Sequence, residues 1–275
     1  MRAVGIILAG GNNNRMKELT HKRAVAAMPI AGSYRSIDFA LSNMTNSHIQ
    51  KVAVLTQYNA RSLNEHLNSS KWWNFGRKQG GLYVFTPTIT NDNGYWYRGT
   101  ADAIYQNMDF LKKSHEPYVV IASGDAVYKM DYSKVLQYHI DKKADVTVVC
   151  KEMDPSDDVS RFGTIRMDDD MRITEFEEKP MVTKSNMIST GIYVIRRRLL
   201  IDLIEHAAEE ERFDFVNDVL IRYKNLKKIY GYKIDHYWSN IATVDAYYKT
   251  NMDFLKPEVR NYFFKQDPEI YSKVS

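Results

Sequence analysis

A glycine pair, Gly10-Gly11, follows the branched apolar run at residues 4–9, and Arg15 lies just behind it. Backbone amides at such a turn, with a cation beside them, can bind a phosphate group. The pair equally suits a tight turn that holds no ligand. It is not a dinucleotide-binding fingerprint, because asparagine occupies residues 12–14, where that pattern needs a further glycine. A phosphate site therefore needs support from the rest of the chain.

The elements that must position this turn alternate along the chain. Several apolar runs have the composition of buried strands, at residues 4–8, 52–56, 119–122, 146–149 and 192–195. Segments with helical spacing lie between them, at residues 101–112 and 132–141. This alternation predicts an α/β fold, in which a Rossmann-like, mainly parallel mixed sheet carries helices on both faces.

A second strand end carries polar residues. Ser123-Gly124-Asp125 directly follows a predicted strand, as Gly10-Gly11 does. Ligands of such sheets bind beyond the carboxyl ends of the strands. Two strand ends thus deliver glycine to one edge of the sheet, and one of them also delivers a carboxylate.

The composition is that of an ordinary globular protein. With 275 residues and 44% hydrophobic content, the chain can bury one large core or two modest ones. A net charge of +4, from 38 basic and 34 acidic residues, is too small to indicate nucleic acid, although it is compatible with anionic small ligands. The single cysteine, Cys150, follows an apolar run and is expected to be buried in a reducing compartment. We find neither a membrane-spanning stretch nor a secretory leader, so we expect a cytoplasmic protein without membrane partners.

No internal repeat or low-complexity linker divides the chain, so residues 1–255 are expected to form one domain. Residues 256–275 carry two prolines and little periodicity, which favours a linker.

The chain also contains, in order, LAGGNNNRMKELTHKRA, GSYRSIDFALSN, WYRGTADAIYQN, SGDAVYKMDY, FEEKP, STGIYVI and YWSNIATVDAYY. As a set these resemble the signature segments of bacterial ADP-glucose pyrophosphorylases (glucose-1-phosphate adenylyltransferases), over nearly the whole chain. The resemblance implies a GT-A-like sugar nucleotidyltransferase fold, followed after the linker by a left-handed β-helix domain. It also implies a reaction of glycogen biosynthesis, in which ATP and glucose 1-phosphate give ADP-glucose and pyrophosphate. This in-line displacement needs amides and cations around the phosphates, with Mg²⁺ held by carboxylates.

The resemblance assigns roles to individual residues. It places Gly10, Gly11 and Arg15 at the nucleotide phosphates, and Tyr97, Gly99, Thr100 and Asp102 along the nucleotide-sugar site. Asp125 matches the metal-binding aspartate of the family and, with Arg15, makes up the implied catalytic set. From the residues alone, compensation of a helix dipole is the favoured interpretation of the Asp102 carboxylate.

The resemblance also implies a sugar pocket. Glu178 would accept sugar hydroxyls and Lys179 would meet the sugar phosphate, while Ser189, Asp214 and Trp238 would line the pocket. Carboxylates for hydroxyls and an aromatic ring for an apolar face suit a sugar. Without the resemblance, a solvated pair is the favoured interpretation of Glu178 and Lys179, and a core position is the favoured interpretation of Trp238.

Two charged positions of the family pattern are replaced. Val25 stands where the family has a lysine, and a valine cannot donate to a phosphate. Asn240 stands where the family has a second metal-binding aspartate, and it offers a carbonyl oxygen without negative charge. Catalysis at ordinary rates is therefore not expected, and restoring charge with Val25→Lys and Asn240→Asp should raise turnover.

This loss of charge resembles the regulatory, D-type subunit that some Gram-positive bacteria combine with a catalytic subunit. We therefore expect a hetero-oligomer partner with little or no intrinsic catalysis, with ATP, glucose 1-phosphate or ADP-glucose as ligands and Mg²⁺ required only for catalysis. One alternative is an active enzyme in which Asn240 is a neutral metal ligand. Another is a sugar-phosphate sensor outside glycogen metabolism.

Overall fold

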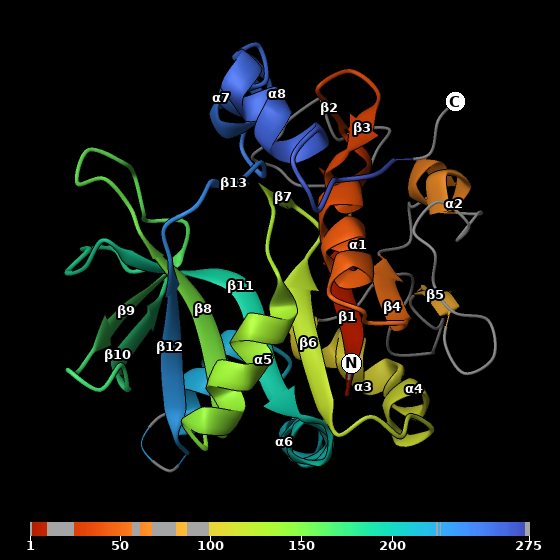
Figure 1. Ribbon diagram of the computed structural model, residues 1–275. Coiled ribbons are helices and arrows are strands. Elements are labelled where there is room, and N and C mark those ends of the chain that lie inside the picture. Colours follow the sequence, from red (N-terminus) through yellow and green to blue (C-terminus); the bar gives the residue numbers. More distant parts are fainter. Residues whose placement is uncertain are drawn as a thin grey trace.

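The computed structural model describes residues 2–9, 25–56, 61–67, 81–86, 99–223, 225 and 227–272. Within these residues a nine-stranded sheet forms the centre of the molecule, and helices cover both of its faces (Figure 1). The arrangement confirms the predicted α/β fold. None of the described helices is long and apolar enough to cross a membrane.

The central sheet is mixed. Its strands are β1 (Ala3–Ala9), β4 (Lys51–Thr56), β5 (Gly81–Phe85), β6 (Tyr118–Ser123), β8 (Val146–Glu152), β9 (Gly163–Met167), β10 (Ile173–Glu178), β11 (Met187–Arg196) and β12 (Ile229–Ile234). The hydrogen-bonded order is β10-β9-β11-β6-β1-β4-β5, and β8 pairs with both β11 and β12. β1 is parallel to β4 and β6, whereas β11 is antiparallel to β6 and β8. Each predicted strand lies within one of these strands.

The described helices are α1 (Ser36–Asn46), α2 (Arg61–Leu67), α3 (Thr100–Gln106), α4 (Met108–Lys112), α5 (Tyr132–Asp141), α6 (Arg197–Glu209), α7 (Val244–Asp253) and α8 (Pro257–Phe264). The predicted helix at residues 132–141 is confirmed as α5. The one predicted at 101–112 is divided into α3 and α4 at Asn107, whose amide Nδ2 donates to the Ala103 oxygen at 2.8 Å. Asparagine side chains compete for backbone groups in this way, which explains the break.

Successive side chains of β1 pack into two separate hydrophobic cores. Ile6 and Ile7 are both buried, and because successive strand side chains point to opposite faces they enter different apolar clusters. The cluster around Ile7 is closed by α1, α2 and α5, and the cluster around Ile6 by α3, α4 and α6 (Figure 1). The predicted placement of helices on both faces is thus confirmed.

Two small sheets lie outside the central one. β2 (Pro29–Ile30) pairs with β3 (Tyr34–Arg35), and β7 (Ala126–Tyr128) pairs antiparallel with β13 (Trp238–Asn240). In the second pair Asn240 lies opposite Ala126. This register brings the end of β13 beside Asp125, the residue that precedes β7.

The segment expected to be a linker folds onto the domain. Pro257 begins α8, at a position where proline costs no helical hydrogen bond. Phe263 of α8 is fully buried and packs edge-on against Phe39 of α1, with ring centroids 5.4 Å apart. Residues 257–264 therefore belong to the packed structure, and the β-helix domain expected beyond them stays a prediction.

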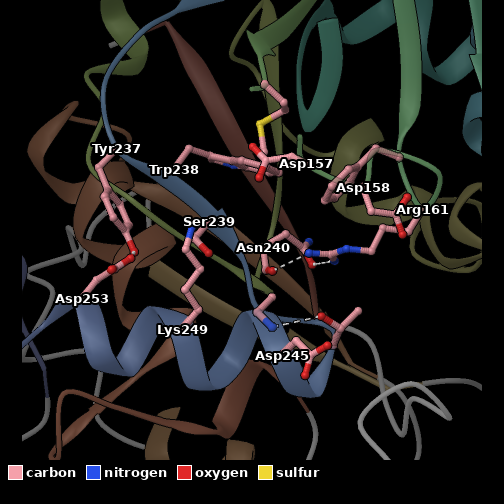
Figure 2. Close-up of a pocket in the computed structure, with 14 residues that line it drawn as sticks. Asp157, Asp158, Arg161, Tyr237, Trp238, Ser239, Asn240, Asp245, Lys249 and Asp253 are labelled. Atoms are coloured by element: carbon pink, nitrogen blue, oxygen red, sulfur yellow. Dashed lines mark hydrogen bonds between the residues drawn. The ribbon is translucent and has the colours of Figure 1, made fainter. Parts of the chain in front are cut away.

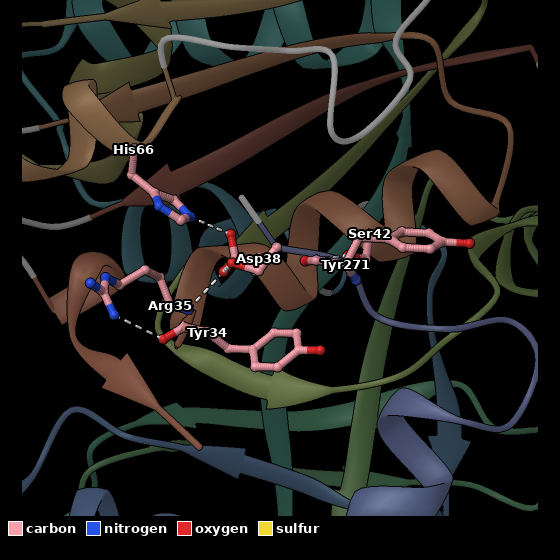
Figure 3. A network of polar contacts seen from close by, with 7 residues as sticks. Tyr34, Arg35, Asp38, Ser42, His66 and Tyr271 are labelled. Atoms are coloured by element: carbon pink, nitrogen blue, oxygen red, sulfur yellow. Dashed lines mark hydrogen bonds and ion pairs between the residues drawn. The ribbon is translucent and has the colours of Figure 1, made fainter. Parts of the chain in front are cut away.

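Helix α1 begins at a buried carboxylate that also contacts the tail. Asp38 Oδ2 accepts hydrogen bonds from the Arg35 backbone N–H at 2.7 Å and from Ser272 Oγ at 2.6 Å. Its Oδ1 lies 2.6 Å from Nε2 of His66 in α2 (Figure 3). One carboxylate thus holds the first turn of α1, α2 and the tail together.

Candidate functional site

A cavity of about 150 Å³ lies at the edge of the central sheet where β6 ends, the edge at which the sequence predicts ligand binding. Glu178 at the end of β10, Ser189 in β11 and Trp238 in β13 all line it. The structure therefore brings together three residues of the expected sugar pocket. Phe162 supports the Trp238 ring in an edge-on contact, with centroids 5.6 Å apart.

The cavity has the polarity that a sugar requires. Burial raises the pKa of Glu178, Lys179 opposes this rise, and the nearby charge of Asp214 adds to it. Ser189 Oγ lies 3.3 Å from the Tyr193 hydroxyl, which adds a second hydrogen-bonding group to the wall. A carboxylate, hydroxyls and an indole face can together hold a ring that has both hydroxyl groups and apolar C–H surfaces.

Two expected pocket residues do not line the cavity. Lys179 is exposed, with φ of 46°, and its backbone N–H donates to the Phe162 oxygen at 3.2 Å. Asp214 is exposed as well, and its Oδ1 accepts from the Asn217 backbone N–H at 2.9 Å. Lys179 directly follows Glu178 at the end of β10. Because successive side chains of a strand point to opposite faces, the Lys179 side chain does not share the face of Glu178. Asp214 instead caps the helical segment that follows it.

Gly99 and Thr100 fix α3 to a neighbouring segment. A Cβ at Gly99 would come within 2.4 Å of the Phe213 backbone oxygen, so only glycine fits this close approach. Thr100 Oγ1 accepts from the Phe215 backbone N–H at 3.1 Å. Neither residue lines the cavity. The contacts described for Gly99 and Thr100 are structural, and the role of both residues in binding a nucleotide stays a prediction.

Asp102 is fully buried in the first turn of α3, where its Oδ2 accepts from Gln106 Nε2 at 2.9 Å. A carboxylate in the first turn is also favoured by the helix dipole. The other expected nucleotide residues, Gly10, Gly11, Arg15 and Tyr97, lie outside the described residues.

Asp125 directly follows β6 and is partly buried. Its backbone oxygen accepts from the Ile241 N–H at 2.9 Å, and its own N–H donates to Ser123 Oγ at 3.1 Å. Among the described residues, its side-chain Oδ1 is buried without a hydrogen-bond partner. This burial raises the pKa of Asp125 to about 7. A divalent cation with oxygen ligands would satisfy this atom.

Asn240 does not fit as a second metal ligand. Its Oδ1 accepts from Arg161 Nη1 at 2.7 Å (Figure 2). The same oxygen accepts from the Ala242 backbone N–H at 2.9 Å. Arg161 Nη2 also donates to the Asn240 backbone oxygen at 2.9 Å. A carbonyl oxygen has two lone pairs, and both are used here. The described residues form no cluster of three or more histidine, cysteine or acidic side chains that could hold a metal.

Val25 lies in the core instead of at the cavity. It begins the short 3₁₀ helix Val25–Ala27 and is 1% exposed. Its apolar cluster includes Val127, two residues after Asp125, and Ile241, which follows Asn240. The position where the resemblance places a lysine is thus an apolar packing position.

Arg161 is the residue that the sequence analysis missed. It lines the 150 Å³ cavity and also a second cavity of about 400 Å³, whose wall includes Asp157, Asp245 and Lys249 (Figure 2). Its guanidinium lies over the Phe162 ring, 4.3 Å from the centroid. No motif marks Arg161, and its partner is 79 residues away, so no local signal identifies it.

Comparisons with known proteins confirm the family that the sequence resembles. The family model described as nucleotidyl transferase matches residues 4–257. A glucose-1-phosphate adenylyltransferase of Clostridium novyi (strain NT) is 40% identical over 272 residues, which cover 98% of this chain and 71% of the relative. The corresponding protein of Bacillus cereus (strain Q1) is 41% identical over 274 residues, covering 98% and 73%. That of Thermosipho melanesiensis is 40% identical over 256 residues, covering 92% and 62%.

Proposed function

This chain belongs to the nucleotidyl transferase family, with the glucose-1-phosphate adenylyltransferases as its relatives, and from this premise we propose that it binds glucose 1-phosphate in the 150 Å³ cavity. Glu178 accepts the sugar hydroxyls, and the Trp238 ring covers the apolar face. ATP and ADP-glucose are the nucleotide ligands of the same site. The role is cytoplasmic and belongs to glycogen biosynthesis.

We further propose that the chain is a regulatory subunit with little or no adenylyl transfer of its own, acting in a hetero-oligomer with a catalytic subunit. The hydrogen bonds to Asn240 support this proposal. Arg161 and the Ala242 backbone N–H both donate to the Asn240 amide oxygen, at the position where the family has a metal-binding aspartate. Removing one preorganised group from a transition state typically slows a reaction on the order of 10²–10³-fold. Glucose 1-phosphate can still bind, because Glu178, Ser189 and Trp238 line one cavity.

Asp125 fits Mg²⁺ as a single protein ligand, with substrate phosphates and water as the others. When bound there, Mg²⁺ would offset negative charge on the reacting phosphates. Among the described residues, Asp125 Oδ1 has no hydrogen-bond partner. This favours the second candidate, an active glucose-1-phosphate adenylyltransferase, because a buried structural carboxylate usually has such a partner.

The decisive experiment measures ADP-glucose synthesis from ATP, glucose 1-phosphate and Mg²⁺ by the full-length protein. It is run alone and then mixed with a catalytic subunit from the same organism. A regulatory subunit is supported if the protein alone forms no ADP-glucose but changes the rate or the effector response of the catalytic subunit in the mixture. Strong ADP-glucose synthesis by the protein without a catalytic subunit contradicts the regulatory role and supports an active enzyme.

Binding is tested separately by calorimetry with glucose 1-phosphate. Glu178→Gln should weaken binding about 10-fold, since hydrogen bonds to charged groups contribute about 1.5–3 kcal/mol. The matched control is Glu175→Gln, an exposed position on the same strand. Equal affinities of the wild type, Glu178→Gln and Glu175→Gln for glucose 1-phosphate would contradict the assignment of the sugar cavity.

A further inference from the structure

We propose that a basic cavity at the opposite edge of the central sheet from the sugar cavity binds the phosphate group of a small phosphorylated molecule. The wall of this basic cavity includes Lys143, His139 and Arg196. Tyr118, which begins β6, lines it as well, whereas Ser123, which ends the same strand, lines the sugar cavity. The two cavities share no residue, so the inference goes beyond the proposed function and does not depend on it.

The basic cavity has a volume of about 400 Å³. Its walls come from the end of α5, the start of β6, the end of β11 and the first turn of α6, at the lower end of the molecule in Figure 1. A volume of this size suits a small ligand. Ile140, Ala144 and Leu199 give the wall apolar surface, which can contact the organic part of a phosphate ester.

Two cations of the wall form no ion pair within the described part of the chain. They are Arg196 and Lys143, whereas the neighbouring Lys142 forms such a pair at 2.8 Å. Asp145 is the only carboxylate among the described lining residues, and its Oδ2 accepts from the Lys228 backbone N–H at 2.7 Å. The wall therefore carries more positive than negative charge, which favours an anion.

Arg196 contacts an aromatic ring beside the basic cavity. The guanidinium carbon lies 5.6 Å from the centroid of the Tyr118 ring. A cation over a ring face keeps its N–H groups for other partners, and the planar guanidinium fork matches two phosphate oxygens. The first turn of α6, which follows Arg196, has no acidic residue and no side-chain cap, so the helix dipole adds positive potential there.

His139 provides a buried polar atom that the wall itself does not satisfy. Its side chain is 2% exposed, and its Nδ1 lies 2.7 Å from Thr147 Oγ1. Its Nε2 makes no hydrogen bond with the described residues. Because buried polar atoms normally have partners, this nitrogen indicates a ligand in the basic cavity. With the Thr147 hydroxyl donating to Nδ1, the ring proton lies on Nε2, which can donate it to a phosphate oxygen.

Binding of a dianion should be coupled to protonation of His139. Burial and the charge of Arg196 lower the pKa of this imidazole to about 4, and the charge of Asp145 opposes them. Tyr118 and Thr147, which contact the ring, are uncharged. A bound dianion would offset the lining cations and raise the pKa of His139, so affinity should increase as the pH falls.

The test is an NMR titration of the nitrogen-15-labelled full chain with sulfate, at constant ionic strength. Sulfate keeps its double charge between about pH 5.5 and 7.5, so its own titration does not enter. The signals of His139 Nε2 and of the Ala144 backbone amide should shift saturably. Arg196→Gln should weaken binding about 10-fold or more. Arg198→Gln is the matched control, because it removes the same charge from an exposed side chain outside the lining.

Three further measurements sharpen the test. Lys143→Gln changes an exposed side chain and should also weaken binding, which decides the matter if Arg196→Gln fails to fold, as circular dichroism would show. Lowering the pH from 7.5 to 5.5 should tighten sulfate binding about 3-fold, and His139→Gln, followed at Ala144, should remove this dependence. Glycerol 2-phosphate, a small phosphate ester, should bind at pH 7.5 at least as tightly as sulfate.

Four results would overturn the inference. They are the absence of a saturable shift in the wild type, equal affinity of the wild type and Arg196→Gln, equal losses in Arg196→Gln and Arg198→Gln, and binding of glycerol 2-phosphate that is much weaker than that of sulfate. Equal losses would indicate only diffuse surface charge. None of these results affects the proposed function, and a failure of glucose 1-phosphate to bind would leave this inference intact.

Discussion

Arg161 and Asn240 form a two-pronged contact, in which both terminal nitrogens of the guanidinium donate to oxygens of the same asparagine at 2.7 and 2.9 Å. The contact joins the loop before β9 to the end of β13. It lies beside Asp125, because Asn240 is opposite Ala126 in the β7–β13 pair. Asn240 therefore links Arg161 to the strand pair that begins beside Asp125.

Asn240→Asp should raise adenylyl transfer above the parent rate in Mg²⁺. The new carboxylate retains an acceptor for Arg161 and adds a second negative metal ligand beside Asp125. We expect a gain of about 10-fold or more, a part of the 10²–10³-fold that such a group contributes. ADP-glucose formation checks this, with Asn261→Asp on the exposed face of α8 as the control. An unchanged rate would show that other contacts limit the reaction.

Val25→Lys should destabilise the protein and bring no gain in turnover. The sequence alone suggested that a lysine here restores a phosphate contact, but Val25 is 1% exposed among apolar side chains. An unpaired charge in such surroundings costs about 3 kcal/mol or more. Urea denaturation measures the loss, and Val25→Ile is the control for changed shape. Wild-type stability of Val25→Lys would mean that the lysine reaches solvent or the site.

Asp125→Asn should stabilise the protein above neutral pH. Burial raises the folded-state pKa of Asp125 to about 7, well above its unfolded value, so its contribution to stability is full below about pH 4 and is lost as the pH rises through 7. Asparagine does not ionise, so Asp125→Asn does not lose stability at this site as the pH rises. The gain at pH 8 in EDTA should approach about 4 kcal/mol, since one pKa unit corresponds to about 1.4 kcal/mol.

Urea denaturation of Asp125→Asn at pH 5 and pH 8 measures this gain. Asp169→Asn, on an exposed turn, is the matched control for the loss of one carboxylate. A gain that is the same at both pH values would contradict the pKa assignment.

His139 should make the protein less stable in acid. It is 2% exposed, with Nδ1 2.7 Å from Thr147 Oγ1, and burial together with the charge of Arg196 lowers its pKa to about 4. Between about pH 6.5 and 4 the unfolded chain binds a proton that the folded chain does not, so stability falls as the pH falls through this window. The slope reaches about 1.4 kcal/mol per pH unit.

His139→Gln should reduce that slope, whatever its effect on stability at pH 7. Denaturation midpoints at pH 4.5, 5.5 and 7 provide the measurement, and the exposed His115→Gln is the control. If the slope is unchanged in His139→Gln, another group causes the acid sensitivity.

The sequence by itself determined the strands β1, β4, β6, β8 and β11, the helix α5, and the edge of the sheet where the candidate site lies. Apolar runs of branched residues specify β1 and β6 through local propensity and burial, and Asp125 follows β6 directly in the chain. Residues adjacent in sequence to a strand end are fixed in place by that strand. The motif around Glu178 and the position of Trp238 were likewise sufficient to predict two walls of the cavity.

Only the tertiary structure decided which of these residues act together. Arg161 meets Asn240 across 79 residues, and Val25 packs beside Val127 and Ile241, because of the order of the strands and the register of β7 with β13. Phe263 is buried against Phe39 for the same reason. Contacts between distant segments depend on how whole elements pack, and local propensities do not encode that packing. The charge near position 240 is therefore a property of the fold.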